Sequence, residues 1–417
     1  MELEFYGGAS EFGPNSMELR SGGKSWLFEY GMIVEDMSTP RHKGWDFVKN
    51  LESVFITHAH IDHMGALPML AKHGYRNPVY GTPATLDLMS MMLWDSLKVQ
   101  KNNGMQPLFL SDDIGNIEDQ SRPMVIGQPV GNGLTATAYG AGHIPGSSML
   151  LIEVGGKRIL FTGDVKFEET QLMPAAHADL KNIDVVICES TYWNANHPPR
   201  KELGDRLREV AKEVVLGGGM LLLPSFAVGR SQELLLTLSD LGLPIWMDGM
   251  SVEATRRALL HPEGVKDYGK LAKAFAKAYK MKKGADRRLA LKEPGIVIAT
   301  AGMLSGGPMD FYIRKLHKQE NCRLILNGFQ VPGTPGQVLR DTGVYSHEGF
   351  QVKPKFPIQF MDFSAHCGRD GMLDFLGKVN PAKVMPMHSS GAPDFAKDLQ
   401  SMGFEAFAPK VGEPVSV

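Results

Sequence analysis

Three histidines and an aspartate lie within one short motif, His58-Ala59-His60-Ile61-Asp62-His63. Imidazole and carboxylate are ligands that zinc prefers in proteins. Strand-like residues 54–57 precede the motif, and a helical pattern begins near Gly65. Side chains at i and i+2 of an extended segment share one side, so His58 and His60 can hold one ion together. Asp62 and His63 follow at the turn into the helix, where a second ion can bind. A polar cluster without metal is the alternative, but this density at a strand end favours a metal site.

Three more potential ligands lie far away in the sequence. His143 follows the strand-like residues 134–139, Asp164 follows an apolar run that ends at Thr162, and His388 follows residues 384–387. A single histidine or aspartate in such a place is more often structural. Here all three lie just past the carboxyl end of a strand, where α/β proteins build their sites. We therefore expect them to join the His58 motif.

The elements that must position these residues alternate along the chain. Strand-like runs are almost entirely apolar, which is typical of strands buried on both faces, and occupy residues 53–57, 158–162, 184–188, 295–299 and 322–326. Helical patterns lie at 65–73, 200–216, 231–241, 252–260 and 394–402. This alternation predicts a layered α/β architecture.

Two polar stretches divide the chain. A Pro-rich stretch at 194–199 precedes a long charged helical pattern, and a second stretch rich in Gly, Pro and charge spans 343–355. Site residues recur on both sides of the intervening segment. We therefore expect one domain formed by residues 1–195 and 351–417, with a second domain, residues 196–350, inserted into it.

The composition sets the class of protein. Of 417 residues, 43% are hydrophobic and 22% charged, as in soluble globular proteins. Neither a signal peptide nor a membrane helix is expected, which favours the cytoplasm. Cys188, Cys322 and Cys367 are too scattered for a disulfide framework or a thiolate zinc site. The net charge of −2 gives no general support for nucleic-acid binding, so that function must rest on local features.

With these residues in place, the chain resembles the metallo-β-lactamase superfamily, and specifically its β-CASP branch of nucleic-acid-processing nucleases. The resemblance implies a metallo-β-lactamase αββα sandwich with an inserted α/β β-CASP domain and two Zn²⁺ per chain. It assigns His58, His60 and His143 to the first zinc, Asp62, His63 and His388 to the second, and Asp164 to a bridging position. Glu189, His366 and His388 match the three motifs that are particular to this branch.

The resemblance covers nearly the whole chain, including residues 224–234 and 299–308. Members that act on RNA carry a histidine at the third of those motifs, so His388 favours RNA, and the chain is similar to short prokaryotic relatives of the mRNA cleavage and polyadenylation nuclease. A homodimer is also implied. Two departures stand out: Ser389-Ser390 replaces the usual Gly-Glu, and Pro335 and Gln337 replace the frequent Leu and Arg.

The expected chemistry is phosphodiester hydrolysis. Two metal ions roughly 3.5–4 Å apart would lower the pKa of a bridging water and neutralise charge that develops on phosphate oxygens. We expect Asp62 and Asp164 to hold the resulting hydroxide for in-line attack. The leaving oxygen needs a proton, which we assign to His366, with Glu189 holding its other ring nitrogen. For Glu189, a helix cap or a structural acid is the alternative.

A basic segment, residues 265–292, could guide the RNA. Ten lysines and arginines oppose two aspartates there: Lys266, Lys270, Lys273, Lys277, Lys280, Lys282, Lys283, Arg287, Arg288 and Lys292. The four from Lys270 to Lys280 follow helical spacing over a buried stripe of Leu271, Phe275, Ala278 and Tyr279. A solvated helix face is the ordinary interpretation. The alternative is an electrostatic rail that leads single-stranded RNA to a cleft between the domains. Gly302 and Ser364 are further predicted RNA contacts, the first through backbone amides.

Two rival functions share some of these features. A small-molecule metallo-hydrolase would share the zinc ligands but would lack the inserted domain and the Glu189–His366 pair. A catalytically weak scaffold subunit of an RNA-processing complex would have lost ligands, whereas this chain retains all of them. The altered Ser389-Ser390 keeps the scaffold open as an alternative.

Overall fold

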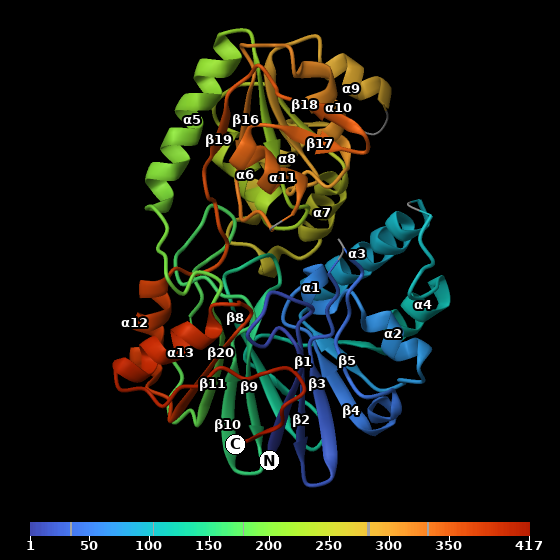
Figure 1. Ribbon diagram of the computed structural model, residues 1–417, viewed down its shortest axis with the longest axis vertical. Coiled ribbons are helices and arrows are strands. Elements are labelled where there is room, and N and C mark those ends of the chain that lie inside the picture. The colour runs from blue at the N-terminus through green and yellow to red at the C-terminus, as the bar shows by residue number, and fades with distance from the viewer. Residues whose placement is uncertain (34–35, 103, 178, 282–283, 332) are drawn as a thin grey trace. The chain divides into compact units, whose positions relative to one another are not determined.

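A computed structural model describes residues 1–33, 36–102, 104–177, 179–281, 284–331 and 333–417. It contains two compact units (Figure 1). The first consists of Met1–Glu169, Pro174–Asn196 and His366–Val417, and the second of Thr170–Met173 and His197–Ala365. The second unit continues past residue 350, where we expected it to end, because β19 (Ile358–Phe360) pairs in parallel with β16 (Arg323–Leu326) of its sheet.

The first unit contains two sheets. The strands of one sheet are, in spatial order, β21 (Val415–Ser416), β1 (Glu2–Gly7), β2 (Ser16–Ser21), β3 (Lys24–Phe28), β4 (Leu51–Phe55), β5 (Val79–Gly81) and β6 (Ser121–Pro123). Those of the other are β20 (Lys383–Met387), β11 (Val185–Glu189), β10 (Lys157–Phe161), β9 (Ser148–Val154), β8 (Thr135–Gly140) and β7 (Pro129–Val130).

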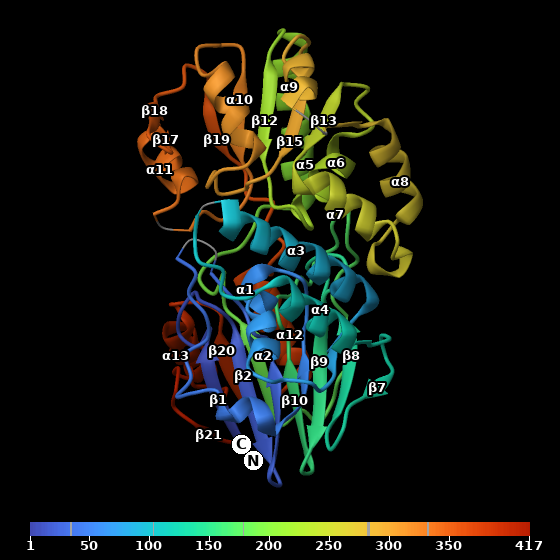
Figure 2. The ribbon, with the colours of Figure 1, turned by 90° about the vertical axis from the view of Figure 1, so that its right-hand side faces the viewer.

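One buried cluster joins the facing sides of these sheets, with Phe5 and Phe28 from one sheet and Ile152 from the other. Because successive strand residues point to opposite faces, the neighbouring Leu151 faces away, toward α12 (Arg369–Val379) and α13 (Ala392–Ser401). The outer side of the first sheet is flanked by α1 (Ile61–Met64), α2 (Leu67–Lys72), α3 (Pro83–Asn102) and α4 (Ser111–Gln120), as Figures 1 and 2 show. A short 3-10 helix spans Asp46–Asn50. The predicted αββα sandwich is confirmed.

The second unit is built on a parallel sheet. Its strands are, in spatial order, β14 (Tyr279–Lys280), β13 (Ile245–Asp248), β15 (Gly295–Ala299), β12 (Met220–Pro224), β16 and β19. Leu221 and Ile296 contribute to one core, and Leu222 and Val297 to another on the opposite face. Burial on both faces explains why these strands are apolar throughout.

Helices of the second unit cover both faces of that sheet. Against one face pack residues of α5 (Arg200–Leu216), α6 (Arg230–Leu238), α7 (Met250–Ala258) and α8 (Tyr268–Lys277). Against the other pack residues of α9 (Gly284–Ala290), α10 (Pro308–Leu316) and α11 (Pro335–Thr342). A hairpin of β17 (Tyr345–His347) and β18 (Phe350–Val352) and a 3-10 helix, Pro262–Gly264, complete this unit.

Several predicted elements coincide with observed ones, notably the helix at 200–216 and the strand at 295–299. The helix predicted at 65–73 corresponds to α2, and a separate one-turn helix, α1, precedes it, so Asp62 and His63 lie within α1. Among the described residues, no helix has the length and apolar character needed to cross a membrane.

Candidate metal centre

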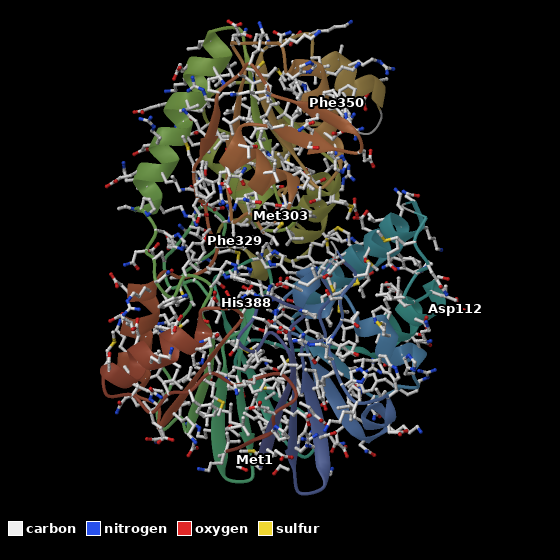
Figure 3. The ribbon with its side chains drawn as sticks, in the orientation of Figure 1. Met1, Asp112, Met303, Phe329, Phe350 and His388 are labelled. Carbon is white, nitrogen blue, oxygen red and sulfur yellow. The ribbon has the colours of Figure 1, made fainter. Side chains whose placement is uncertain are left out.

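Three neighbouring parallel strands bring part of the site together. β11 pairs with β10 on one side and with β20 on the other, and Glu189 is in register with Met387. The carboxyl ends of these strands therefore meet at one edge of the sheet. Asp164 follows β10, Glu189 ends β11 and His388 follows β20. Their proximity is thus a direct consequence of strand order, and Figure 3 labels His388 among them.

The other sheet supplies the histidine motif through the residues after β4. Gly163 makes the approach possible, because a Cβ at this position would lie 2.6 Å from the Thr57 hydroxyl oxygen. Gly163 also has a φ of 51°, in the region that favours glycine. This close passage places Asp164 beside His58.

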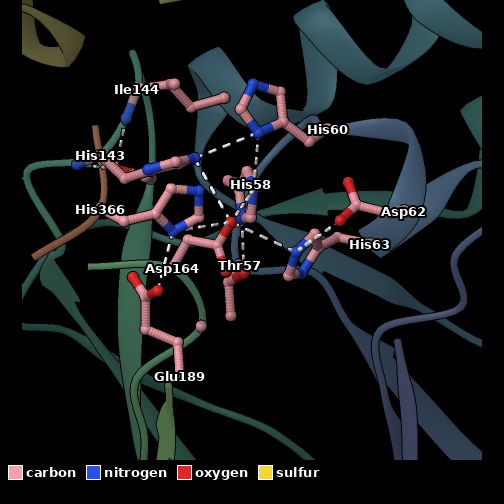
Figure 4. Close-up of polar contacts among 12 residues, drawn as sticks. Thr57, His58, His60, Asp62, His63, His143, Ile144, Asp164, Glu189 and His366 are labelled. Carbon is pink, nitrogen blue, oxygen red and sulfur yellow. Dashed lines mark hydrogen bonds and ion pairs between the residues drawn. The ribbon is translucent and has the colours of Figure 1, made fainter. Parts of the chain in front are cut away.

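Four side chains form the first ligand group: His58, His60, His143 and Asp164, whose potential ligand atoms all lie within 4.8 Å of one another. His60 Nδ1 lies 3.2 Å from His58 Nε2 and 3.1 Å from His143 Nε2. Asp164 Oδ2 lies 3.4 Å from both His58 Nε2 and His143 Nε2. Figure 4 shows these nitrogens converging toward the Asp164 carboxylate.

Asp62, His63 and His388 form the second group. Asp62 Oδ2 lies 3.2 Å from His388 Nε2 and 3.5 Å from His63 Nε2. Asp164 contacts this group as well, since its Oδ2 lies 3.4 Å from His63 Nε2 and its Oδ1 lies 3.6 Å from His388 Nδ1. The structure therefore brings together every residue predicted as a metal ligand, with Asp164 adjacent to both groups.

The ionisation of these side chains suits cation binding. Burial lowers the pKa of His58 well below its ordinary value and lowers that of His60 to about 4, so both imidazoles are neutral and can act as ligands. Burial opposes charge on Asp164, but the surrounding histidines, His388 and His63 foremost, hold the pKa of its carboxyl well below the usual range. Burial likewise opposes charge on His63, yet Asp164 and Asp62 raise its pKa well above the ordinary value. The two carboxylates thus favour positive charge at this place, and the clusters can hold divalent metal.

Glu29 and Thr57 contact His63 and His58, respectively, and orient their rings. The Thr57 hydroxyl donates to Glu29 Oε1 at 2.5 Å and lies 3.0 Å from His58 Nδ1. The same Glu29 oxygen lies 3.7 Å from His63 Nδ1. Glu29 is fully buried, and burial raises the pKa of its carboxyl. We did not single out Glu29 from the sequence, although an acidic residue directly after the apolar end of β3 was an available signal.

Glu189 and His366 form a pair beside the first ligand group. His366 Nδ1 lies 2.8 Å from Glu189 Oε2, and the other Glu189 oxygen accepts from the Val165 N–H at 2.8 Å. Burial disfavours the imidazolium, but the carboxylates of Glu189 and Asp164 raise the pKa of His366 to about 9. The His366 and His143 rings have centroids 4.8 Å apart. The geometry allows a proton to be held at the edge of the site.

The predicted RNA-binding residues belong to the second unit. Lys273 and Lys277 are exposed on α8. The Lys270 ammonium donates to Gln171 Oε1 at 2.6 Å, and that of Lys280 donates to the Ala276 carbonyl at 3.1 Å and lies over the Phe275 ring. Lys282 and Lys283 lie outside the described residues.

The other two predicted contacts, Gly302 and Ser364, are buried. The Gly302 carbonyl accepts from Gln330 Nε2 at 3.3 Å, and the Ser364 carbonyl accepts from the Arg200 guanidinium. The expected buried stripe of α8 is wrong at one position. Tyr279 is 57% exposed, because the helix ends at Lys277 and Tyr279 lies in β14.

Sequence comparisons match three families to successive parts of the chain. The metallo-beta-lactamase superfamily matches residues 47–212, the Beta-Casp domain residues 231–339, and the Zn-dependent metallo-hydrolase RNA specificity domain residues 351–409. A solved structure from Enterococcus faecalis, a protein of unknown function, is 13% identical with a TM-score of 0.65 over 100% of this chain and 99% of that one. At this identity, the likeness shows the fold alone.

Full-length relatives extend these matches. The chain is 33% identical to a probable RNase MJ4 of Methanocaldococcus jannaschii, over 100% of both chains. It is 32% identical to RNase aCSPSF2 of Saccharolobus solfataricus, over 100% of this chain and 85% of the relative. It is 30% identical to the transcription termination factor FttA of Pyrococcus abyssi, over 94% of this chain and 67% of the relative. The chain belongs to the metallo-β-lactamase superfamily and, within it, to the β-CASP ribonuclease branch.

Proposed function

We propose that this protein is a zinc-dependent ribonuclease that hydrolyses RNA phosphodiester bonds with two Zn²⁺ per chain. The observation that carries the proposal is the position of Asp164, whose Oδ2 lies 3.4 Å from His58 Nε2 of the first ligand group and 3.4 Å from His63 Nε2 of the second. The relatives named as RNases, similar over the full length of this chain, support RNA as the substrate.

The donor set fits two divalent cations. The residues that would hold the first ion are His58, His60, His143 and Asp164, and those that would hold the second are Asp62, His63, His388 and Asp164. Asp164 Oδ1 is buried and makes no hydrogen bond to any described residue, which leaves it available as a ligand. When bound, two such ions activate water at neutral pH and neutralise the charge that develops on phosphate oxygens.

His366 supplies the proton for the leaving oxygen. Glu189 holds its Nδ1, and we assign proton donation to a substrate atom to Nε2. The Lys166 ammonium donates to the His366 carbonyl at 3.0 Å and fixes the backbone of the donor. Both partners of the pair are therefore held in place before substrate arrives.

The substrate class we infer is single-stranded RNA, because unpaired bases can be splayed out on a protein surface. Lys270, Lys273, Lys277 and Lys280 are proposed to attract the backbone, and Gly302 and Ser364 to line the path. Lys273 and Lys277 are the stronger candidates, since their ammonium groups make no hydrogen bond or ion pair among the described residues, whereas Lys270 and Lys280 have partners. A merely solvated helix face is the alternative.

One assay separates this function from its rivals. Purified protein with zinc is given end-labelled RNA, single-stranded DNA and a generic lactam or thioester. We expect cleavage of RNA that disappears in the Asp62→Ala and His366→Ala proteins. Intact RNA in metal-replete protein would favour the scaffold, and turnover of the lactam or thioester alone would favour the small-molecule hydrolase. RNAs blocked at either end would then distinguish internal from terminal cleavage.

We also propose a homodimer and a cytoplasmic location. The three cysteines are buried and unpaired, which suits a reducing compartment. Light scattering during gel filtration measures the mass directly, and a monomeric mass across the working concentration range would contradict the dimer.

A further inference from the structure

His388 occupies a backbone conformation that its own residue type does not favour. Its φ is 62°, in the left-handed region where a Cβ is unfavourable. The pairing of β11 with β20 stops one residue earlier, at Glu189 and Met387. Something outside the strand ladder must therefore hold His388 where it is.

Two hydrogen bonds fix that backbone. The Ser190 hydroxyl donates to the Met387 carbonyl at 2.7 Å, and the His388 N–H donates to the Gly8 carbonyl at 2.7 Å. Ser190 is buried, so its bond does not compete with bulk water. The peptide group that leads into His388 is thus held on both sides.

The imidazole is held by the next residue. Thr191 Oγ1 lies 3.1 Å from His388 Nδ1, while His388 Nε2 faces Asp62 Oδ2 at 3.2 Å. An imidazole that offers Nε2 to a cation carries its proton on Nδ1, and that proton needs an acceptor. Asp164 Oδ1, at 3.6 Å from Nδ1, is beyond hydrogen-bond distance. Among the residues that the structure describes, Thr191 Oγ1 is the acceptor within hydrogen-bond distance of this nitrogen.

The residues after His388 do not supply this support. The Ser389 hydroxyl accepts from the Gly391 N–H at 3.0 Å, just before α13 begins, and Ser390 is exposed. Among the described residues neither hydroxyl contacts the His388 ring. These are the two positions at which the family resemblance led us to expect Gly-Glu.

We propose that Ser190 and Thr191 are the positioning residues for His388, Ser190 through its backbone and Thr191 through its imidazole. The inference rests on the proposed metal centre and deepens it. It makes the second ligand group depend on the two residues that directly follow β11, which ends at Glu189. Glu189 then holds His366, Ser190 holds the turn, and Thr191 holds the ring of His388. Thr191 Oγ1 also lies 3.4 Å from His366 Nδ1, but its contact with His388 Nδ1 is the shorter one.

Zinc binding to metal-stripped protein tests the proposal without RNA. Titration against a chromophoric chelator gives the affinity of each of the two sites in the wild type, Thr191→Val, Thr191→Ser and Ser190→Ala. We expect Thr191→Val, which keeps the shape but removes the acceptor, to weaken one site by about 10–100-fold and leave the other unchanged. Thr191→Ser should restore most of the affinity, and Ser190→Ala should weaken the same single site.

Thr237→Val is the matched control, since the Thr237 hydroxyl is also buried but donates to the Glu233 carbonyl within α6 of the second unit. It should bind two ions like the wild type. Wild-type affinities at both sites in folded Thr191→Val and Ser190→Ala proteins would overturn the inference while leaving the metal centre intact. Equal weakening of both sites by Thr191→Val would also overturn it. A wild-type chain that binds fewer than two ions overturns the metal centre and this inference together.

Discussion

Buried aspartates lie at the carboxyl ends of strands in both units, but their neighbours differ. Asp248 ends β13 of the second unit, and its carboxylate accepts from Arg287 Nε at 2.6 Å, Arg287 Nη2 at 3.0 Å and the Tyr312 hydroxyl at 3.0 Å. Asp164 follows β10 of the first unit and faces histidine nitrogens at 3.4 Å or more, with Oδ1 lacking any hydrogen bond among the described residues.

An aspartate at the carboxyl end of a strand therefore has a different role in each unit. Arg287 neutralises Asp248 within the protein, so the second unit needs no cation there. The histidines around Asp164 can act as ligands, and their atoms lie close enough together to hold divalent metal. A carboxylate at a strand end is therefore insufficient for a metal site; the partners that converge on it decide.

The largest expected effect comes from Asp164→Ala. Because this carboxylate faces both ligand groups, we expect RNA cleavage to fall to background and at least one of two zinc ions to be lost. Asp248→Ala is the matched control and should retain both ions, since its partners are not ligands. Zinc content per chain after gel filtration measures the difference, and two ions retained by Asp164→Ala would contradict the comparison.

The second prediction compares two histidine–carboxylate pairs, His366 with Glu189 and His347 with Asp310. His366→Ala should lower the cleavage rate by about 10²–10⁴-fold, as expected for removal of a general acid, with zinc content unchanged. His347 of the second unit lies beside Asp310, with 3.7 Å between Nδ1 and Oδ1, but takes no part in the centre. His347→Ala should cleave at nearly the wild-type rate. Single-turnover rates test both, and equal rates in all three proteins would remove His366 from the mechanism.

Asp248→Asn should affect stability rather than chemistry. It leaves Arg287 and Tyr312 with weakened partners and should lower the free energy of unfolding by about 2 kcal/mol, less than a fully buried pair because Arg287 is partly exposed. Urea denaturation measures this. Asp341→Asn, at an exposed ion pair with Arg340, should change stability little. Unchanged stability in Asp248→Asn would show that Asp248 and Arg287 do not form a stabilising ion pair, and the contrast with Asp164 would fail.

A change in ionisation is the subtler test of the proton donor. In metal-stripped protein we expect a pKa of about 9 for His366, because the nearby carboxylates outweigh burial. Glu189→Gln removes the closest negative charge, so the imidazolium becomes less favourable and the pKa must fall. Titration of the His366 ring by NMR measures the direction. A pKa that stays the same or rises would contradict the claim that the Glu189 carboxylate stabilises the His366 imidazolium.

The smallest effect is expected from the lysines of α8. Replacing Lys273 and Lys277 together with alanine should weaken RNA binding a few-fold and reduce the slope of log affinity against log salt by roughly 1 for each lysine. Lys270→Ala should do less, because its ammonium is bonded to Gln171. An unchanged slope in the double variant would identify these lysines as a solvated face.

Local sequence determined much of this protein. The motif from His58 to His63 indicates a metal centre because four potential ligands lie within six residues. Apolar strands such as 295–299 indicate a layered α/β fold, because a strand buried on both faces is apolar at almost every position. His143, Asp164 and His388 could be attached to the motif because each follows a strand.

Only the tertiary structure decided the details that depend on distant chain segments. The support of His58 by Glu29 through Thr57, the hold of Thr191 on His388 and the exposure of Tyr279 all follow from which strand lies beside which, or from where a helix stops. The contacts of Glu29 with Thr57 and of Thr191 with His388 join residues far apart in sequence, so no local period encodes them. Hydrogen-bond geometry, fixed to a few tenths of an ångström, arises only when the sheets are assembled.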